Sequence, residues 1–324
     1  MHLPDGFLDA KTALLTTGAA AVGVGSALRQ VRTSAEPRRL PMLGLAGAFV
    51  FAAQMLNFPI AGGTSGHLLG GVLAAILLGP GAAVTVMTCV LIVQCLMFAD
   101  GGLMALGANV FNMAIVNVWG GYLVFRSIKR WARMEEARAT VLAAAFAGWF
   151  GTVLAAVACA GELALSRSAP WSVAFPAMTL THMLIGIGEG AATGLITLAV
   201  LRARPDLVAG NVKEKNHPGS GWSFVAYGLV VSVGLAVFVA PFACSWPDGL
   251  EKVAKALGFA NRAAAPFLHS PIAEYRLPGI GSAAAATAVA GVLGTAMAFV
   301  AAYTLARFLV PALEQEKKDA PSRN

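Results

Sequence analysis

The stretch "GGTSGHLLGGVLAAILLGPGAAVTVMTCVLIVQCLMF", residues 62–98, contains two apolar runs of different length. The second run, 82–98, is long enough to cross the hydrocarbon core of a bilayer, which takes about 20 residues of helix. The first run, 67–79, is too short to cross alone and follows several glycines. Irregular backbone must avoid lipid, so we expect a glycine-rich loop folded into the protein, followed by a short helix.

The composition extends this interpretation to the whole chain. Of its 324 residues, 57% are hydrophobic and 12% charged, and the mean hydropathy is +0.71. Soluble domains carry about 25% charged residues, so this composition indicates a multi-span membrane protein. The cysteines lie inside apolar runs without metal or redox spacing, so we expect four small buried residues, not disulfides. They are Cys89, Cys95, Cys159 and Cys244.

Nine apolar segments predict an all-α polytopic membrane protein with about nine transmembrane helices. The segments are 10–29, 40–57, 67–79, 82–98, 105–126, 139–165, 171–201, 222–245 and 281–310. Most of the 23 basic residues fall in four clusters, at 29–39, 126–138, 202–215 and 307–323. Nine crossings put all four clusters on one side, which the positive-inside rule makes cytoplasmic. The N-terminus is then outside and the C-terminus cytoplasmic, and the net charge of +7 needs no nucleic acid as partner.

The polar stretch "RARPDLVAGNVKEKNHPGSG", residues 202–221, divides the chain. We expect a membrane domain over 1–205, a cytoplasmic linker over 206–221, a two-helix domain over 222–312 and a cytoplasmic tail over 313–324. The triplet Pro-Asp-Gly occurs twice, at 4–6 and 247–249, and both copies should lie outside. Because this triplet is common in turns, turn chemistry alone can explain the repetition.

The N-terminus "MHLPDGF" has no basic residue before its first apolar run, so we expect it to be retained. The α-amine of Met1, the backbone nitrogen of His2 and the His2 imidazole can close two chelate rings around one metal ion. Such planar nitrogen coordination suits Ni(II) or Cu(II), and it should weaken in acid because the donors must lose protons. The alternative is a frayed, exposed terminus.

A fourth ligand should come from the same face of the membrane. His67 is the candidate, since it lies outside at the mouth of the short helix, where Thr64 and Ser65 can supply supporting hydrogen bonds. A hydrogen-bonded cap on a buried loop is the alternative role for His67. The remaining histidines are His182 in the seventh span, His217 in the linker and His269 in the outer segment of the two-helix domain.

Other polar residues fall within the predicted spans. His182 and Glu189 share a helix face, and they either relay protons or form a hydrogen-bonded pair that locks helices together. The relay would make the protein an ion-coupled secondary carrier. Asn109, Asn112 and Asn117 are expected to form interhelical hydrogen bonds. A membrane metalloprotease is excluded because the sequence lacks HExxH spacing.

Three motifs resemble those of a known family. "MHLPDGF" at the terminus, "GGTSGHLLGG" at 62–71 and "ADGGLMALGAN" at 99–109 look like the NikM/CbiM type, the nickel/cobalt substrate-capture (S) subunits of energy-coupling-factor transporters. The similarity covers about 1–205, and Ala99 departs from the expected glycine. Region 222–312, with "WPDGLEKVAKALGF", resembles the PDGLE-containing NikN-type subunit, here fused to the first.

The resemblance implies a ligand set of the Met1 amine, the His2 backbone and ring nitrogens and the His67 imidazole. Ni(II) or Co(II) would be the transported substrate, with nickel favoured and cobalt the alternative, and no organic cofactor is implied. The implied partners are a transmembrane coupling (T) subunit and two ATPase subunits in a bacterial cell (inner) membrane. The chain has no GxxxxGK[ST] sequence, so it is not expected to be an enzyme itself.

Overall fold

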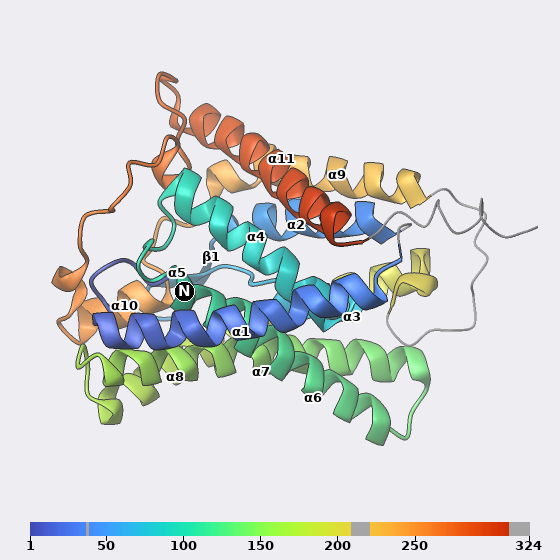
Figure 1. The fold of residues 1–324 in the computed structure, drawn as a ribbon, viewed down its shortest axis with the longest axis horizontal. Helices are drawn as coiled ribbons and strands as arrows, with labels where there is room; N and C mark the ends of the chain where they lie inside the picture. Colours follow the sequence, from blue (N-terminus) through green and yellow to red (C-terminus); the bar gives the residue numbers. More distant parts are fainter. Residues whose placement is uncertain (37–38, 209–220, 311–324) are drawn as a thin grey trace, which may run out of the picture.

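The computed structural model describes residues 1–36, 39–208 and 221–310, and these fold almost entirely into helices (Figure 1). His217, most of the predicted linker and the tail over 313–324 lie outside the described residues. Six described helices are long and apolar enough to cross a membrane. They are α4 (Pro80–Phe98), the combined helix Leu106–Trp131, α7 (Glu136–Leu165), α8 (Trp171–Ala203), the span Trp222–Phe242, which covers all but the first residue of α9 (Gly221–Phe238), and α11 (Ala283–Leu309).

Three further helices occupy the other predicted spans. Helix α1 (Ala10–Ser34) is long but less apolar, α2 (Leu40–Gln54) has 15 residues and α3 (Gly71–Leu78) has 8. All nine predicted segments are therefore helical, and the protein is a multi-pass membrane protein. That the chain crosses nine times, with its N-terminus outside, stays a prediction.

The glycine-rich stretch before α3 is an irregular loop, as expected. Strands β1 (Phe58–Ile60) and β2 (Thr64–Gly66) pair antiparallel around a turn in which Gly62 and Gly63 have φ of 86° and 73°. Such left-handed angles favour glycine. The predicted helix start at 67 is wrong, because strand pairing continues to Gly66 and the helix begins only at Gly71.

The helix over Leu106–Trp131 is continuous but not uniform. It consists of α5 (Leu106–Asn109), a π-helical segment η2 (Val110–Val116) and α6 (Asn117–Trp131). The segment between α9 and α11 contains the short amphipathic helix α10 (Gly249–Ala256), capped by Asp248. Four 3₁₀ turns complete the described elements: η3 (Pro205–Leu207), η4 (Ala240–Phe242), η5 (Ala260–Arg262) and η6 (Ala273–Tyr275).

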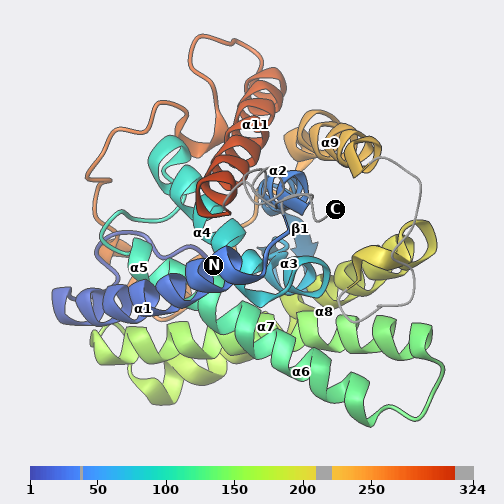
Figure 2. The same cartoon turned by 45° about the vertical axis from the view of Figure 1, so that its right-hand side comes forward.

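The helices form two groups with the N-terminus between them. Helices α6, α7 and α8 pack together on one side, and α2, α9 and α11 pack together with α4 on the other (Figures 1 and 2). Small residues permit close packing of α7 and α8, since a Cβ at Gly190 would lie 2.5 Å from the Ala145 carbonyl oxygen. The chain start therefore lies in the interior of the molecule.

Candidate metal centre

The N-terminal segment is buried and fixed, which contradicts the alternative of a frayed terminus. Met1 is 4% exposed and Leu3 is fully buried. The Leu3 amide donates to Asn109 Oδ1 at 2.7 Å, and Asn109 Nδ2 donates to the Leu3 carbonyl at 3.1 Å. Asn109 was expected to bridge helices, but its side chain clamps the terminal segment instead.

Asp5 closes the turn that follows. Its carboxylate accepts hydrogen bonds from the backbone amides of Leu103, Met104 and Ala105 at 3.2, 2.8 and 3.2 Å. These amides lie in the loop just before helix α5, about a hundred residues later in the chain. The three bonds hold the terminal segment against the ADGGLMALGAN loop.

The Met1 amine lies beside the His67 imidazole. The amine nitrogen is 2.8 Å from His67 Nε2, and His67 Nδ1 is 3.2 Å from the Leu68 carbonyl oxygen. The second contact favours a proton on Nδ1 and leaves the Nε2 lone pair facing the amine. Two nitrogen ligands at about 2.0–2.1 Å from a metal, at right angles, lie about 2.8–3.0 Å apart. The amine and His67 are therefore already spaced as adjacent ligands of one ion.

The His2 ring completes the donor set. Both ring nitrogens are buried without a hydrogen-bond partner among the described residues, and the His2 and His67 ring centroids lie 5.4 Å apart. The nearest carboxylate oxygen, Asp100 Oδ1, is 3.6 Å from Nδ1. Buried polar groups are rarely left unpaired, so these nitrogens are available to a metal ion. The structure thus brings together all three predicted residues, Met1, His2 and His67.

Burial also sets the protonation of the two rings. Desolvation lowers the pKa of the His2 imidazole below its ordinary value. Desolvation, assisted by the neighbouring ammonium group, lowers the pKa of the His67 imidazole to about 3. Both rings are therefore neutral at physiological pH, the form that binds metal.

Glu189 supports the loop that carries His67. Its carboxylate accepts hydrogen bonds from the Leu69 and Gly70 amides at 2.6 and 2.9 Å. His182 instead places Nδ1 2.8 Å from the Met178 carbonyl oxygen. The expected pairing of His182 with Glu189 is therefore wrong, because each satisfies backbone groups of a different segment.

The two-helix domain contributes groups that we did not predict. Asp248 Oδ2 lies 2.8 Å from the Met1 amine, and the amine holds the pKa of this carboxyl well below its usual range although burial acts to raise it. The Tyr275 hydroxyl donates to Asp100 Oδ2 at 2.5 Å while its ring stacks on Phe98. Two features of the sequence include Asp248: the repeated Pro-Asp-Gly triplet and the motif WPDGLEKVAKALGF.

The same domain is bonded to the β2 strand. Ser65 Oγ donates to the Trp246 carbonyl at 2.7 Å, and Thr64 Oγ1 donates to the Pro247 carbonyl at 3.0 Å. These hydroxyls were expected to support His67 directly. Instead they bond to residues 246–251, here called the PDGLE segment, and hold it beside His67. That segment forms part of the wall of the candidate site.

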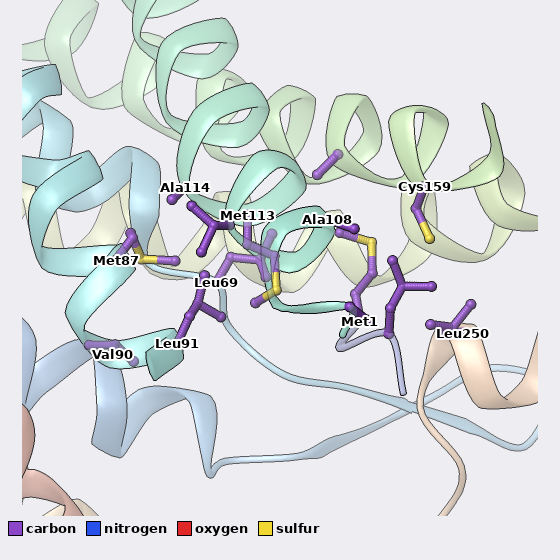
Figure 3. Close-up of a cluster of buried hydrophobic side chains, with 14 of the residues drawn as sticks. Met1, Leu69, Met87, Val90, Leu91, Ala108, Met113, Ala114, Cys159 and Leu250 are labelled. Carbon is purple, nitrogen blue, oxygen red and sulfur yellow. The ribbon is translucent and has the colours of Figure 1, made fainter. Parts of the chain in front are cut away.

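A cavity of about 10 Å³, room for about one water molecule, lies at the site. Its lining residues are Met1, Gly66, His67, Leu69, Thr152, His182, Ile185, Asp248 and Gly249. The Met1 side chain belongs to the buried cluster drawn in Figure 3, together with Leu69, Cys159 and Leu250. The apolar surroundings exclude bulk water, and the polar groups converge on the amine.

Known proteins share this organisation. The family described as "Cobalt uptake substrate-specific transmembrane region" (CbiM) matches residues 2–207, and the PDGLE domain matches 222–310. A NikMN chain of Archaeoglobus fulgidus is 38% identical over 310 residues, covering 95% of this chain and 99% of that relative. The fused nickel transport protein NikMN of Rhodobacter capsulatus is 35% identical over 223 residues, 64% of each chain.

Two further relatives match the first domain. The cobalt transport protein CbiM 1 of Pelobacter propionicus is 34% identical over 212 residues, covering 62% of this chain and 91% of that protein. The crystal structure of a truncated transition metal transporter superposes with a TM-score of 0.57 at 34% identity, covering 63% of this chain and 99% of that one. The chain therefore belongs to the CbiM family of substrate-specific transmembrane regions and carries a PDGLE domain at its C-terminal side.

Proposed function

We propose that this chain is the substrate-binding membrane subunit of an ATP-driven energy-coupling-factor importer for Ni(II). It captures the ion on the extracytoplasmic side with the Met1 amine, the His2 backbone and ring nitrogens and the His67 imidazole. The observation that carries the proposal is the 2.8 Å spacing of the Met1 amine and His67 Nε2 beside the unpartnered His2 ring. The proposal requires that the working protein begins with a free amine at Met1.

Capture exchanges protons for metal. The ammonium group of Met1 gives up one proton to become an amine ligand, and the His2 amide gives up a second. The two released protons carry the same charge as the divalent ion that replaces them. The net charge facing Asp248 and Asp100 is therefore the same before and after loading, which keeps the cost of burying the cation low.

The donor set favours nickel over cobalt. Four nitrogens in one plane match the tetragonal preference of Ni(II), and affinity for nitrogen sites rises from Co(II) to Ni(II). The relatives include proteins named for either metal. Cobalt is the alternative substrate because it accepts the same donors.

Transport itself requires partners. The chain has no phosphate-binding GxxxxGK[ST] sequence, so two ATPase subunits would supply ATP hydrolysis and a transmembrane coupling (T) subunit would transmit it. The secondary-carrier alternative loses support, since both carboxylate oxygens of Glu189 accept from backbone amides and His182 Nδ1 lies against the Met178 carbonyl.

The test is Ni(II) binding by the purified chain, with no residue preceding Met1, in lipid nanodiscs. We expect about one ion per chain, lost in both His2→Ala and His67→Ala and kept in the matched control His269→Ala, whose histidine is exposed. Thermal unfolding checks that each variant is folded. Retained binding in folded His2→Ala would overturn the chelate, and ATP-independent uptake by the chain alone would overturn the importer assignment.

A further inference from the structure

A second and larger cavity shares no described lining residue with the cavity at the metal centre. Its volume is about 300 Å³, and helices α2, α3, α8 and α9 contribute its walls. Its described lining residues are glycines or have apolar side chains, apart from the Tyr227 hydroxyl. Helix α9 packs on α2, and α3 packs on both α2 and α8 (Figure 2). The cavity, here called the α9 groove, therefore lies where the first helix of the PDGLE domain meets the CbiM region.

The α9 groove opens toward the bilayer. It is lined on one edge by Val231 and Tyr227 of the spanning helix α9, which are 55% and 74% exposed. An apolar groove left empty loses the dispersion contacts of its walls. The hydrocarbon around a membrane protein is as apolar as leucine, so a lipid chain can restore these contacts without losing any polar ones.

The volume of the α9 groove fits an acyl chain better than a helix. An apolar cavity of about 150 Å³ holds one benzene molecule, so about 300 Å³ accommodates about twelve carbon atoms of a lipid chain. A helix about 10 Å across takes up about 120 Å³ per residue, so the groove would hold only about two residues of a partner helix.

Arginines lie at one end of the α9 groove. Arg204, at the end of α8, places its guanidinium carbon 5.6 Å from the ring centroid of Phe224, which lines the groove. Asp206 offsets part of this charge by accepting from Arg204 Nε and Nη2 at 2.8 and 2.7 Å. Arg202 is exposed in the same turn of α8 as the lining residue Val200. Basic pockets between spanning helices attract the phosphate groups of anionic lipids.

We propose that the α9 groove binds one acyl chain of an anionic phospholipid, whose phosphate lies at Arg202 and Arg204. The bound chain fills the space between α9 and α8 and stabilises the packing of the PDGLE domain on the CbiM region. No covalent bond forms or breaks, and the site is independent of the metal centre.

Native mass spectrometry of the full chain in detergent tests the site. Dioleoyl phosphatidylglycerol is the anionic probe and dioleoyl phosphatidylcholine the zwitterionic one, so the two lipids differ only in the headgroup. Val231→Trp places a large side chain at the groove. Its matched control is Val230→Trp, because Val230 is the preceding residue of α9, is 71% exposed and does not line the groove. Arg202→Gln removes a charge, and Arg126→Gln at an exposed site on α6 is its control.

We expect one phosphatidylglycerol to bind per chain, at least tenfold more tightly than phosphatidylcholine. Val231→Trp should weaken this binding at least tenfold and Arg202→Gln about fivefold, while both controls bind as wild type. Equal binding of the two lipids, or unchanged binding by folded Val231→Trp, overturns the proposal.

A second variant covers the case in which Val231→Trp does not fold. Ala46→Phe fills the groove from α2, and Ala19→Phe adds the same ring to the exposed face of α1 as its control. Phosphatidylglycerol should raise the unfolding temperature of wild type and of the controls, but not that of the variants that fill the groove. Equal stabilisation of all variants overturns the site. A dimer that dissociates in Val231→Trp would assign the groove to a second copy of the chain, which overturns the lipid site equally.

Discussion

The two Pro-Asp-Gly triplets, at 4–6 and 247–249, both place an aspartate that accepts hydrogen bonds from backbone amides, but the two aspartates have different further contacts. Asp5 uses both carboxylate oxygens on three backbone amides at the start of α5. Asp248 uses Oδ1 to cap its own helix, accepting from the Glu251 amide at 2.8 Å, and turns Oδ2 to the Met1 amine. Only Asp248 caps a helix, and only Asp248 has an oxygen that contacts the Met1 amine at the candidate metal centre.

The difference shows how context assigns the role of a turn motif. Asp5 is 7% exposed and its partners are all backbone groups, so its contribution is to fold the terminal segment. Asp248 meets the charged Met1 amine, which in the proposed chelate loses a proton when metal binds. We therefore expect substitutions of Asp5 to act through stability, and substitutions of Asp248 to act through binding.

The largest effect should follow from Asp5→Ala. Removing the carboxylate leaves three backbone amides without their acceptor, at a cost of about 3 kcal/mol in the free energy of unfolding. Metal binding should be lost with it, because the terminal segment is no longer held. Thermal unfolding in detergent and Ni(II) titration measure the two effects. The control is Asp9→Ala, which removes the exposed cap of α1 and should cost only about 1 kcal/mol with binding retained. Normal binding by Asp5→Ala would refute this role.

A smaller and more selective effect is expected for Asp248→Asn. The amide keeps the shape and can still cap α10, but the charge-assisted bond to the amine is lost. The charge count at the site is the same with and without metal, so the effect is on the position of the amine, and we expect Ni(II) affinity to fall about tenfold. Glu251→Gln, on the same helix, should bind as wild type. If Asp248→Asn lowered the unfolding temperature as much as Asp5→Ala does, the two aspartates would not differ in role as we expect.

Acid should weaken Ni(II) binding, and the slope of affinity against pH distinguishes protonation of the amine and the His2 amide from protonation of an imidazole. Burial lowers the pKa of His67 to about 3, so between about pH 5 and 7 this ring does not compete for protons. The protons released by the amine and the His2 amide remain, and affinity should fall about tenfold per pH unit for each of them as pH drops. Ni(II) titrations across this range give the slope. A flat profile, or a single step near pH 6.5 as for an ordinary imidazole, would contradict the chelate.

The smallest effect should come from Tyr275→Phe. The ring can still stack on Phe98, while Asp100 loses one hydrogen bond and its fixed orientation toward His2. One hydrogen bond of this kind corresponds to about a threefold change in Ni(II) affinity. Tyr303→Phe in α11 is the matched control and should change nothing. A loss as large as that of Asp248→Asn would place the main contribution of the PDGLE domain at Asp100 instead of at the amine.

Much of this architecture could be predicted from local sequence. Apolar runs located the nine helical segments, because a helix in lipid must satisfy its own backbone. The donors at Met1 and His2 are adjacent in sequence, so their chelate rings follow from covalent geometry alone. Ala99, where the resemblance called for glycine, adopts a φ of 55°, which shows why glycine was expected there.

The contributions of the second domain could not be predicted in the same way. Asp248 is 247 positions from Met1, and no local pattern reports a contact at that separation. Asn109, Thr64 and Ser65 were recognised as hydrogen-bonding residues, but their partners depend on where the terminal and PDGLE segments dock. His182 and Glu189 share a helix face, yet each is hydrogen-bonded to backbone groups instead of to the other. Helical periodicity shows which residues share a face but not which partners they bind.

The separation between Met1 and Asp248 also has a consequence for biosynthesis. The amine is the first group of the chain to be made, whereas Asp248 is made after most of the helices have entered the membrane. During that interval the amine has His67 as a neighbour but lacks its carboxylate partner, and closing so long a loop is slow. If the chain start binds metal as we propose, the site is complete only when synthesis is nearly finished, and incompletely made chains should not trap metal at full affinity.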